Sequence, residues 1–562
     1  MGILSVANQS PNMNHLYYGD NLDNLRKYVR DETVDLCYID PPFNSKRNYN
    51  QIYNNIGKED VAQAQAFVDT WEWDQLAENG FGEIIGNTRG LFPQKTINLM
   101  LGLQTVLGQS SLFAYLISMT LRIGEIHRVL KPTGSFYLHC DPTSSHYLKL
   151  VLDSVFCSGG GYFQNEIIWK RTSARSDSHK WNHIHDVIFF YTKSRTYTWN
   201  TQFTNYDETY IKKFYRHIEE GTGRMYASDN LTADGIRNGL SGLPWMGIDI
   251  TSKGLHWKYT VDKLNELDKE GRIIHPKKAG GVPRYKRYLD EMPGVAVQSI
   301  INDIQPLSAQ SAEKLGYPTQ KPEALLERII KASSNEGDVV LDAYCGCGTT
   351  VAVAQKLNRQ WIGIDITYQS ISLILKRLED SYGKGVIEGV KLTGLPKDMQ
   401  GAEALAEQKD DRVRKEFEKW AVLTYSNNRA AINQKKGADQ GIDGWGFFPI
   451  NHKDFGRIIF QVKSGKVSSK DIRDLLGTIT REKAELGIFI TLQKPSKEMV
   501  KEAKASGLYH YELFGRDTDK IKIVTIQEML EQGKRLDVPL VAGVLKSAPR
   551  HDDAQQLDLL VV

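Results

Sequence analysis

Cysteine is scarce in this chain, and long apolar runs are lacking. Its 562 residues include five cysteines, an odd number without the regular spacing of a disulfide-bonded domain, so we expect no disulfide framework. The most apolar stretch, residues 101–121, is interrupted by polar residues, among them two glutamines and three serines. This favours a helix packed in a core over a membrane span. The first 20 residues have no basic segment followed by an apolar one, and we therefore expect no signal peptide and an intracellular protein.

An excess of either charge is also lacking. There are 71 Lys and Arg against 68 Asp and Glu, a net charge of +3, which excludes a protein coated in positive charge. Any surface that binds nucleic acid must therefore be local. Residues 161–300 hold 21 Lys and Arg against 16 Asp and Glu, a difference of +5, and 20 aromatic residues. Their weak periodicity and frequent Gly and Pro predict an irregular, basic and aromatic module rather than a further layer of a sheet.

Strands and helices alternate in two other parts of the chain. Apolar runs at residues 16–20 and 34–39 flank a helical segment at 22–29, and a long helix ending near Leu130 precedes a strand at 135–139. After residue 322 the pattern returns, with helices at 323–332 and 349–357 and strands at 339–341 and 361–366. A polar stretch at 397–409 leads to another such region at about 413–545. These patterns predict an α/β fold with a parallel sheet and a second α/β domain.

A glycine-rich turn follows the predicted strand at 339–341. Gly346 and Gly348 place backbone N–H groups and a helix N-terminus around a polar or anionic cofactor. Asp365 ends the next strand, where an acid can accept hydrogen bonds from ribose hydroxyls. The alternative is a purely structural corner, since a tight strand-to-helix turn needs similar glycines.

The tetrapeptide at 40–43 ends an earlier strand. Its two prolines restrict the backbone, so the Asp40 carboxylate and a neighbouring carbonyl project at fixed angles, and Phe43 offers a flat face. This combination suits an exocyclic amine on a planar base, with two acceptors for its two N–H groups. The alternative is a simple strand-terminating turn.

Together the two motifs resemble those of the DNA amino-methyltransferases, which use S-adenosylmethionine (SAM) to methylate adenine N6 or cytosine N4. The order, with the amine motif first and the basic module between the motifs, is similar to the beta group of that family. Further similar segments are 19–22 (Gly-Asp-Asn-Leu), 165–169 (Asn-Glu-Ile-Ile-Trp) and 317–323 (Tyr-Pro-Thr-Gln-Lys-Pro-Glu). The resemblance covers about residues 14–385. It implies a Rossmann-like methyltransferase fold with an inserted target recognition domain, and double-stranded DNA as partner.

The resemblance also implies the site residues. The catalytic, base-binding set is Asp40, Pro41, Pro42 and Phe43, and the SAM-binding set is Asp20, Lys321, Asp342, Tyr344, Gly346, Gly348, Thr349, Thr350 and Asp365. A flipped-out base would present its amine to Asp40, which localises the nitrogen lone pair, and this step requires no metal. Adenine N6 is favoured, because cytosine members of the family more often carry Ser at the Asp40 position. Cytosine N4 and a DNA-binding protein that has lost methyl transfer are the alternatives.

In the family the inserted module reads the DNA sequence. Here it is expected at 195–310, between the two halves of the methyltransferase domain at 14–194 and 311–390. The candidate DNA contacts are Trp245, Trp257, Lys277, Lys278, Arg284, Lys286 and Arg287. Solvated surface and a small aromatic core are the alternative for most of them.

The second domain, expected at 413–545 after a linker at 391–412, resembles the Mrr-like branch of the PD-(D/E)xK endonucleases. The resemblance makes Asp443 and Gln461 ligands of Mg²⁺ and Lys463 the catalytic lysine, with Glu416 or Glu418 as a further ligand. Gln461 departs from the acidic pattern, which weakens metal binding. The domain is therefore either an active endonuclease of a restriction–modification protein or a decayed, DNA-binding one.

The tail at 546–562 carries a short peptide motif. Residues 556–560, from Gln556 to Leu560, resemble the peptide with which bacterial proteins bind the sliding clamp, although a frayed apolar terminus has the same composition. A homodimer is a further expectation. DNA as partner, together with the lack of a signal peptide, indicates a cytoplasmic, DNA-associated bacterial protein.

Overall fold

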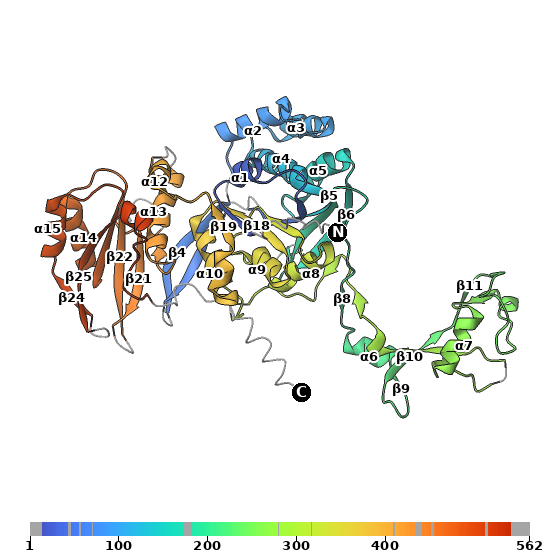
Figure 1. Cartoon of the computed structure of the whole chain (residues 1–562). Coiled ribbons are helices and arrows are strands. Elements are labelled where there is room, and N and C mark those ends of the chain that lie inside the picture. Colours follow the sequence, from blue (N-terminus) through green and yellow to red (C-terminus); the bar gives the residue numbers. More distant parts are fainter. Residues whose placement is uncertain are drawn as a thin grey trace, which may run out of the picture. The chain divides into compact units, whose positions relative to one another are not determined.

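The computed structural model describes residues 14–42, 47–55, 58–69, 71–172, 179, 181–278, 280–308, 310–315, 317, 319–407, 411–433, 441–450, 454–511 and 515–540. One compact unit is formed by Thr201–Gln298, and the described residues on either side of that segment form the other unit. Figure 1 shows the helices and strands of both units.

A mixed sheet forms the centre of the larger unit. Among the described residues, nine strands lie in the order β16-β6-β7-β5-β2-β17-β18-β1-β19. The strands are β1 (Asn14–Tyr18), β2 (Val34–Ile39), β5 (Leu130–Cys140), β6 (Tyr162–Lys170), β7 (His185–Thr192), β16 (Ile300–Ile301), β17 (Val339–Asp342), β18 (Gln360–Asp365) and β19 (Val390–Thr393). The strand β17 pairs in parallel with both β2 and β18, so the carboxyl ends of these three strands meet at one edge. Ligands of open α/β sheets bind at such an edge.

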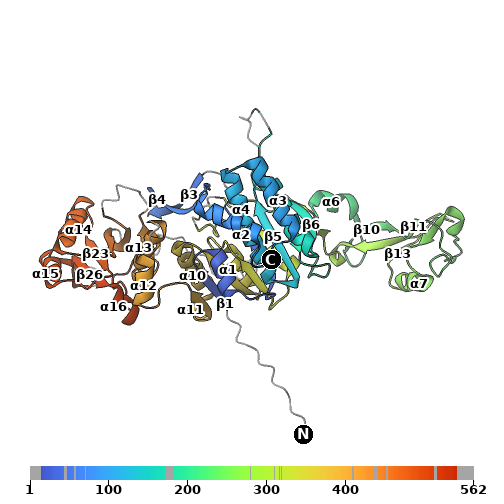
Figure 2. The same ribbon diagram turned by 90° about the horizontal axis from the view of Figure 1, so that it is seen from above.

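Helices cover both faces of this sheet. In β2 the side chains alternate: Leu36 and Tyr38 belong to one hydrophobic core, Cys37 and Ile39 to another. The first core takes in α8 (Glu323–Ser333), α9 (Thr349–Lys356) and α10 (Tyr368–Tyr382), and the second takes in α1 (Asn21–Tyr28), α3 (Gln94–Leu107), α4 (Ser111–Val129) and α5 (Ser145–Phe156). Figure 2 gives a second view of these helices. The predicted α/β class is confirmed.

The predicted elements agree with the structure in most places. The strand–helix–strand unit near the N-terminus is present as β1, α1 and β2, but β17 and β18 lie between its two strands in the sheet. The predicted long helix ending near Leu130 is present as α4, which ends at Val129. The apolar stretch at 101–121 is not one helix, because the chain turns at Gly108, whose φ is +57°, and Ser110 caps α4. Tyr162–Lys170 and His185–Thr192 also differ from the prediction, because they form β6 and β7 of the main sheet.

The expected linker at 391–412 contains regular structure. It includes β19 and α12 (Met399–Ala406), whose Ala402 and Ala406 are buried. The polar average of this stretch hides that apolar face. The next helix, α13 (Asp411–Tyr425), places Phe417 and Trp420 in the same hydrophobic core as Tyr368 of α10. The C-terminal domain therefore packs on α10 of the first α/β domain instead of following a polar tether.

The C-terminal domain has its own sheet. Its described strands lie in the order β20-β21-β22-β23-β26, and the last three are parallel. They are β20 (Ala431–Ile432), β21 (Gly444–Pro449), β22 (Phe455–Lys463), β23 (Leu486–Thr491) and β26 (Ile521–Thr525), with helices α14 (Ser469–Arg481), α15 (Lys497–Ala505) and α16 (Ile526–Glu531) and a small pair, β24 (Leu508–Tyr511) and β25 (Arg516–Asp519).

The smaller unit, Thr201–Gln298, is built from short elements. It contains a sheet of β13 (Ile273–Ile274), β14 (Arg284–Tyr288), β10 (Met225–Asn230) and β9 (His217–Ile218), the pairs β11 (Thr232–Asp234) with β12 (Leu255–Trp257) and β8 (Phe203–Thr204) with β15 (Val295–Ala296), and helices α6 (Glu208–Phe214) and α7 (Val261–Lys269). Trp245 and Trp257 are buried in its core, with ring centroids 5.5 Å apart. Their prediction as DNA contacts was wrong, since a buried ring has no face for a base.

Further described elements complete the larger unit. They are the hairpin of β3 (Arg47–Asn55) and β4 (Lys58–Asp69), and the helices α2 (Gln75–Gly86) and α11 (Lys384–Glu388). Within the described part of the chain, no helix combines the length and the apolar character needed to cross a bilayer.

Candidate functional site

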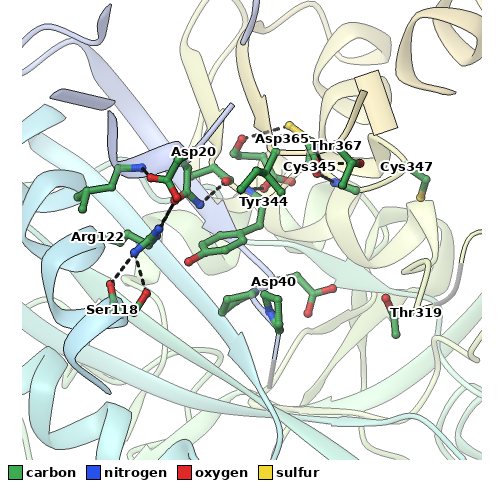
Figure 3. Close-up of a pocket in the computed structure, with 18 of the residues that line it drawn as sticks. Asp20, Asp40, Ser118, Arg122, Thr319, Tyr344, Cys345, Cys347, Asp365 and Thr367 are labelled. Atoms are coloured by element: carbon green, nitrogen blue, oxygen red, sulfur yellow. Dashed lines mark hydrogen bonds and ion pairs between the residues drawn. The ribbon is translucent and has the colours of Figure 1, made fainter. Parts of the chain in front are cut away.

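A cavity of about 890 Å³ opens at the carboxyl ends of β2, β17 and β18. Its volume lies in the range of about 300–1,000 Å³ that is typical of small-molecule sites. Most of the predicted catalytic and SAM-binding residues line it: Asp20, Asp40, Pro41, Pro42, Lys321, Asp342, Tyr344, Gly346, Thr349, Thr350 and Asp365. Figure 3 shows part of this lining. Gly348 is not part of this lining, and Phe43 is outside the described residues.

The glycine-rich turn is close-packed, which explains its two glycines. Gly346 has φ +51°, and a Cβ there would lie 3.1 Å from the Tyr317 ring. Gly348 has φ +73°, and its Cβ would lie 2.7 Å from Ile374. A larger residue at either position would strain the backbone and push the turn into the cavity. Gly348 also precedes α9, so the helix N-terminus faces this turn.

Asp365 ties the glycine-rich turn to the start of α10. Its Oδ2 atom accepts a hydrogen bond from the Gly346 N–H at 2.9 Å, and its Oδ1 atom accepts one from the Thr367 N–H at 2.9 Å. Burial raises the pKa of Asp365 to about 6. Burial is also the main reason why the pKa of Asp342 rises to about 7, and the charges of Asp40 and Asp365 add to that effect.

These carboxyl groups give the cavity a negative potential. The charges of Asp40 and Asp365 lie close enough to Asp342 to raise the pKa of that buried carboxyl group. A cation bound among them would lower this mutual repulsion. The cavity is therefore suited to a ligand with positive charge.

A polar network connects α1 and α4 at another side of the cavity. The Asp20 carboxylate accepts a hydrogen bond from the Leu22 N–H at 2.8 Å, which caps α1, and forms an ion pair of 2.7 Å with Arg122. Arg122 also donates to Ser118 Oγ at 2.7 Å (Figure 3). Asn21 donates to the Ala343 carbonyl at 2.8 Å. Sequence reasoning missed Arg122, because it lies in α4 without a local motif.

Asp40 and Lys321 face each other at the end of β2. The Lys321 ammonium group donates to Asp40 Oδ2, and both side chains are largely buried. Asp40 Oδ1 is buried and has no hydrogen-bond partner within the part of the chain that the structure describes. A buried acceptor of this kind is costly unless a ligand satisfies it. Lys321, which was expected to bind the cofactor, thus lies beside Asp40 of the motif at 40–43.

A second buried network lies behind the end of β2. The Tyr38 hydroxyl lies 2.8 Å from His139 Nδ1, and His139 Nε2 lies 3.1 Å from Asp186 Oδ2. Arg171 pairs with the other oxygen of Asp186 at 3.3 Å. The ring of His139 and this arginine lower the pKa of Asp186 against the opposing effect of burial. This hydrogen-bonded network fixes the strand that precedes Asp40. No pattern in the sequence predicted it.

The predicted endonuclease residues are arranged differently from an open metal site. Asp443 Oδ2 accepts a hydrogen bond from the Val462 N–H at 2.6 Å, and Gln461 is buried. Lys463 ends β22 and is half-buried. In the described ranges, no three His, Cys, Asp or Glu side chains are grouped to hold a metal ion. Glu416, suggested as a further ligand, accepts a hydrogen bond from the Tyr368 N–H at 3.0 Å and pairs with Lys419.

Two family models match the chain. Residues 34–376, more than half of the chain, match the model described as DNA methylase (N6_N4_Mtase). Residues 413–531 match the model described as NACHT-associated inactive Restriction Endonuclease 1. The predicted likeness of the second domain to restriction endonucleases is thus supported. The matching model, however, describes an inactive restriction endonuclease.

Several characterised proteins are similar to the chain. Type II methyltransferase M.EcaI of Enterobacter cloacae is 33% identical over 266 residues, which cover 47% of this chain and 57% of that protein. The StyLTI Mod subunit of Salmonella typhimurium, a type III restriction-modification enzyme, is 27% identical over a region that covers 63% of this chain and 52% of that subunit. DNA adenine methyltransferase YhdJ of Escherichia coli K12 is 24% identical over 65% of this chain and 82% of its own. The chain thus spans little more than half the length of the first two.

Proposed function

Because the chain belongs to the DNA methylase family, we propose that it transfers a methyl group from SAM to the N6 amino group of adenine in double-stranded DNA. It would serve as the modifying activity of a restriction–modification system. The observation that carries the proposal is the buried Oδ1 atom of Asp40, which has no hydrogen-bond partner among the described residues and belongs to a residue that lines the same cavity as the glycine-rich turn.

The chain's own residues explain how an amino group would be activated. Asp40 Oδ1 accepts one N–H of the amino group, and the Pro41 carbonyl accepts the other. These bonds localise the nitrogen lone pair, which in a free base is delocalised into the ring. Lys321 holds the other Asp40 oxygen and fixes the direction of the free one. Phe43 stays the predicted stacking partner of a flipped-out base.

The other half of the cavity fits SAM. SAM supplies a methyl group on a positively charged sulfur, and the carboxyl groups of Asp342 and Asp365 complement a cation. The positive φ of Gly346 and the packing of Tyr317 against it leave a concave surface that a side chain at residue 346 would fill. Asp20 is held by Arg122 at the opposite side, and Tyr344 and Thr350 complete the lining.

Adenine is proposed over cytosine for two reasons. The motif at 40–43 begins with Asp, whereas cytosine members of the family more often have Ser at this position. YhdJ, one of the similar proteins, is named as an adenine methyltransferase. The test is to digest DNA that the purified protein has methylated and to identify the modified nucleoside by mass spectrometry. N6-methyladenine is expected, and N4-methylcytosine would favour the alternative.

Mg²⁺-dependent cleavage of DNA by the second domain stays a prediction. We favour the alternative that this domain is a decayed, DNA-binding relative of the endonucleases. The neutral Gln461 stands at the second ligand position, and the Asp443 carboxylate is already bound to a backbone N–H. Incubation of the purified protein with unmethylated DNA and Mg²⁺, under conditions in which methylation proceeds, decides the matter. Intact DNA is expected, whereas cleavage that Lys463→Ala abolishes would establish an endonuclease.

The Thr201–Gln298 unit is proposed to read the DNA sequence. Lys277 and Lys278 are exposed and therefore available to phosphates. Lys286 is paired with Glu219 at 2.7 Å and Arg287 with Asp229 at 3.2 Å, so these two cations serve the fold of the unit first. The predicted clamp-binding motif at 556–560 lies outside the described residues, and the clamp and a homodimer stay predictions.

A further inference from the structure

We propose that α13, the first helix of the endonuclease-like domain, forms part of the SAM-binding site and that Glu416 is the residue that positions it there. The proposal rests on the function proposed above. It assigns to the second domain a role in methyl transfer that needs neither a metal ion nor DNA cleavage.

The cavity wall is the first observation. Glu416 and Lys419 of α13 line the same cavity as Asp365, Ile366 and Thr367, which follow one another at the end of β18. Ile366 is 57% exposed, so this part of the cavity wall is open to a ligand. Asn433 and Asp443 of the second domain also contribute to the lining. Both domains thus enclose the end of the cavity where Asp365 lies.

The hydrogen bonds at this point are the second observation. Asp365 Oδ1 accepts from the Thr367 N–H at 2.9 Å, and Glu416 Oε2 accepts from the next amide, Tyr368 N–H, at 3.0 Å. Two carboxylates from two domains therefore hold consecutive amides at the N-terminus of α10. A negative charge at this end of a helix is also favoured by the helix dipole. The acid proposed to bind the ribose hydroxyls is held in place partly by the second domain.

The packing beneath these bonds is the third observation. Phe417 and Trp420 of α13 are at most 2% exposed, and they share a core with Tyr18 of β1 and Tyr368 of α10. The Tyr368 hydroxyl lies 3.2 Å from Thr424 Oγ1. Lys419 pairs with Glu416 and so fixes the direction of its carboxylate. An apolar contact flanked by such bonds keeps α13 against the cavity without a ligand.

If α13 forms this wall, SAM affinity and the docking of α13 must depend on each other, because linkage is reciprocal. The experiment uses the full chain. SAM affinity is measured by isothermal titration calorimetry for the wild type, Glu416→Ala and Glu416→Gln. Hydrogen exchange of residues 411–425 is followed with and without SAM. Glu498→Ala, an exposed residue of α15 in the same domain, is the matched control.

We expect Glu416→Ala to weaken SAM binding about tenfold, since a hydrogen bond to a charged acceptor is lost. Glu416→Gln keeps an acceptor for the Tyr368 amide, so its SAM affinity should lie between those of the wild type and Glu416→Ala. Glu498→Ala should bind SAM as tightly as the wild type does. SAM should slow exchange in 411–425. The inference about α13 is overturned, and the proposed function is not, if the wild type and Glu416→Ala bind SAM equally well and SAM leaves hydrogen exchange in α13 unchanged. If the wild type does not bind SAM, the proposed function fails with it. If Glu416→Ala does not fold, two other measurements decide. The inference is overturned if SAM does not slow hydrogen exchange in residues 411–425 of the wild type and Glu416→Gln binds SAM as tightly as the wild type.

Discussion

The Lys321 ammonium group contacts one carboxylate oxygen of Asp40, and the other oxygen stays buried without a hydrogen-bond partner among the described residues. The two residues are 281 positions apart in the chain, on opposite sides of the inserted unit. The pair places an acidic side chain in the lining of the cavity with one of its oxygens held by a cation. Its free oxygen is the feature that links this fold to the chemistry of an amino group.

The Asp40–Lys321 pair predicts a strong energetic coupling. Lys321→Met should lower the free energy of unfolding by about 2–3 kcal/mol, because it leaves a buried carboxylate without its cation. The double variant Asp40→Asn/Lys321→Met should lose less than the two single losses added together, since no charge is left unpaired. Urea unfolding followed by circular dichroism measures all four proteins. Strict additivity would show that the two side chains do not interact.

SAM binding should depend on pH. The pKa of Asp342 is raised to about 7 and that of Asp365 to about 6, so both are increasingly protonated as the pH falls from 8 to 5.5. A cation binds better to the ionised carboxylates, and affinity should therefore fall with pH, by up to about tenfold per unit for each proton involved. Calorimetry across this range checks the trend. Asp342→Asn should flatten the part of the curve near pH 7, and an unchanged curve would remove Asp342 from the account.

The glycine-rich turn should not tolerate a methyl group at residue 348. Gly348→Ala places a Cβ 2.7 Å from Ile374 in a backbone with φ +73°, at a cost of about 1–3 kcal/mol. The displaced turn should weaken SAM binding about tenfold or more. Gly385→Ala is the matched control, because residue 385 lies in α11 with open space around it. Equal SAM affinities of the two variants would speak against a role of the turn.

Exposed lysines of the Thr201–Gln298 unit should contribute to DNA binding through phosphates. The variant Lys277→Ala/Lys278→Ala should reduce the slope of log affinity against log salt concentration by about 2, without a change in the sequence that is methylated. Fluorescence anisotropy at several salt concentrations measures the slope. Lys263→Ala, whose lysine is already paired with Glu266, is the control. A slope equal to that of the wild type would place the phosphate contacts elsewhere.

Local patterns predicted the strands and turns that form the site. Asp40, Asp342 and Asp365 each end a strand with a clear apolar pattern, and the parallel pairing of β17 with β2 and β18 brings them together. Gly346 and Gly348 were found because a tight turn before a helix needs glycine there. These features depend on neighbours in the sequence, which a single sequence shows directly.

Contacts between distant segments could not be predicted in this way. Arg122 meets Asp20 across 102 positions, and His139 meets Asp186 across 47, and no motif surrounds Arg122, His139 or Asp186. The count of aromatic residues in the basic module did not distinguish Trp257, which is fully buried, from exposed rings. The docking of α13 on α10 depends on faces that only the folded chain brings together.

The most direct test is to incubate wild-type protein and Asp40→Ala with unmethylated DNA and SAM, and to map the modified bases by modification-sensitive sequencing, with calorimetry to confirm that both proteins bind SAM. Our account predicts N6-methyladenine at a defined sequence with the wild type, and none with Asp40→Ala although its SAM affinity is largely retained. Substantial methylation by Asp40→Ala, or a wild type that binds SAM and modifies no adenine, would contradict it.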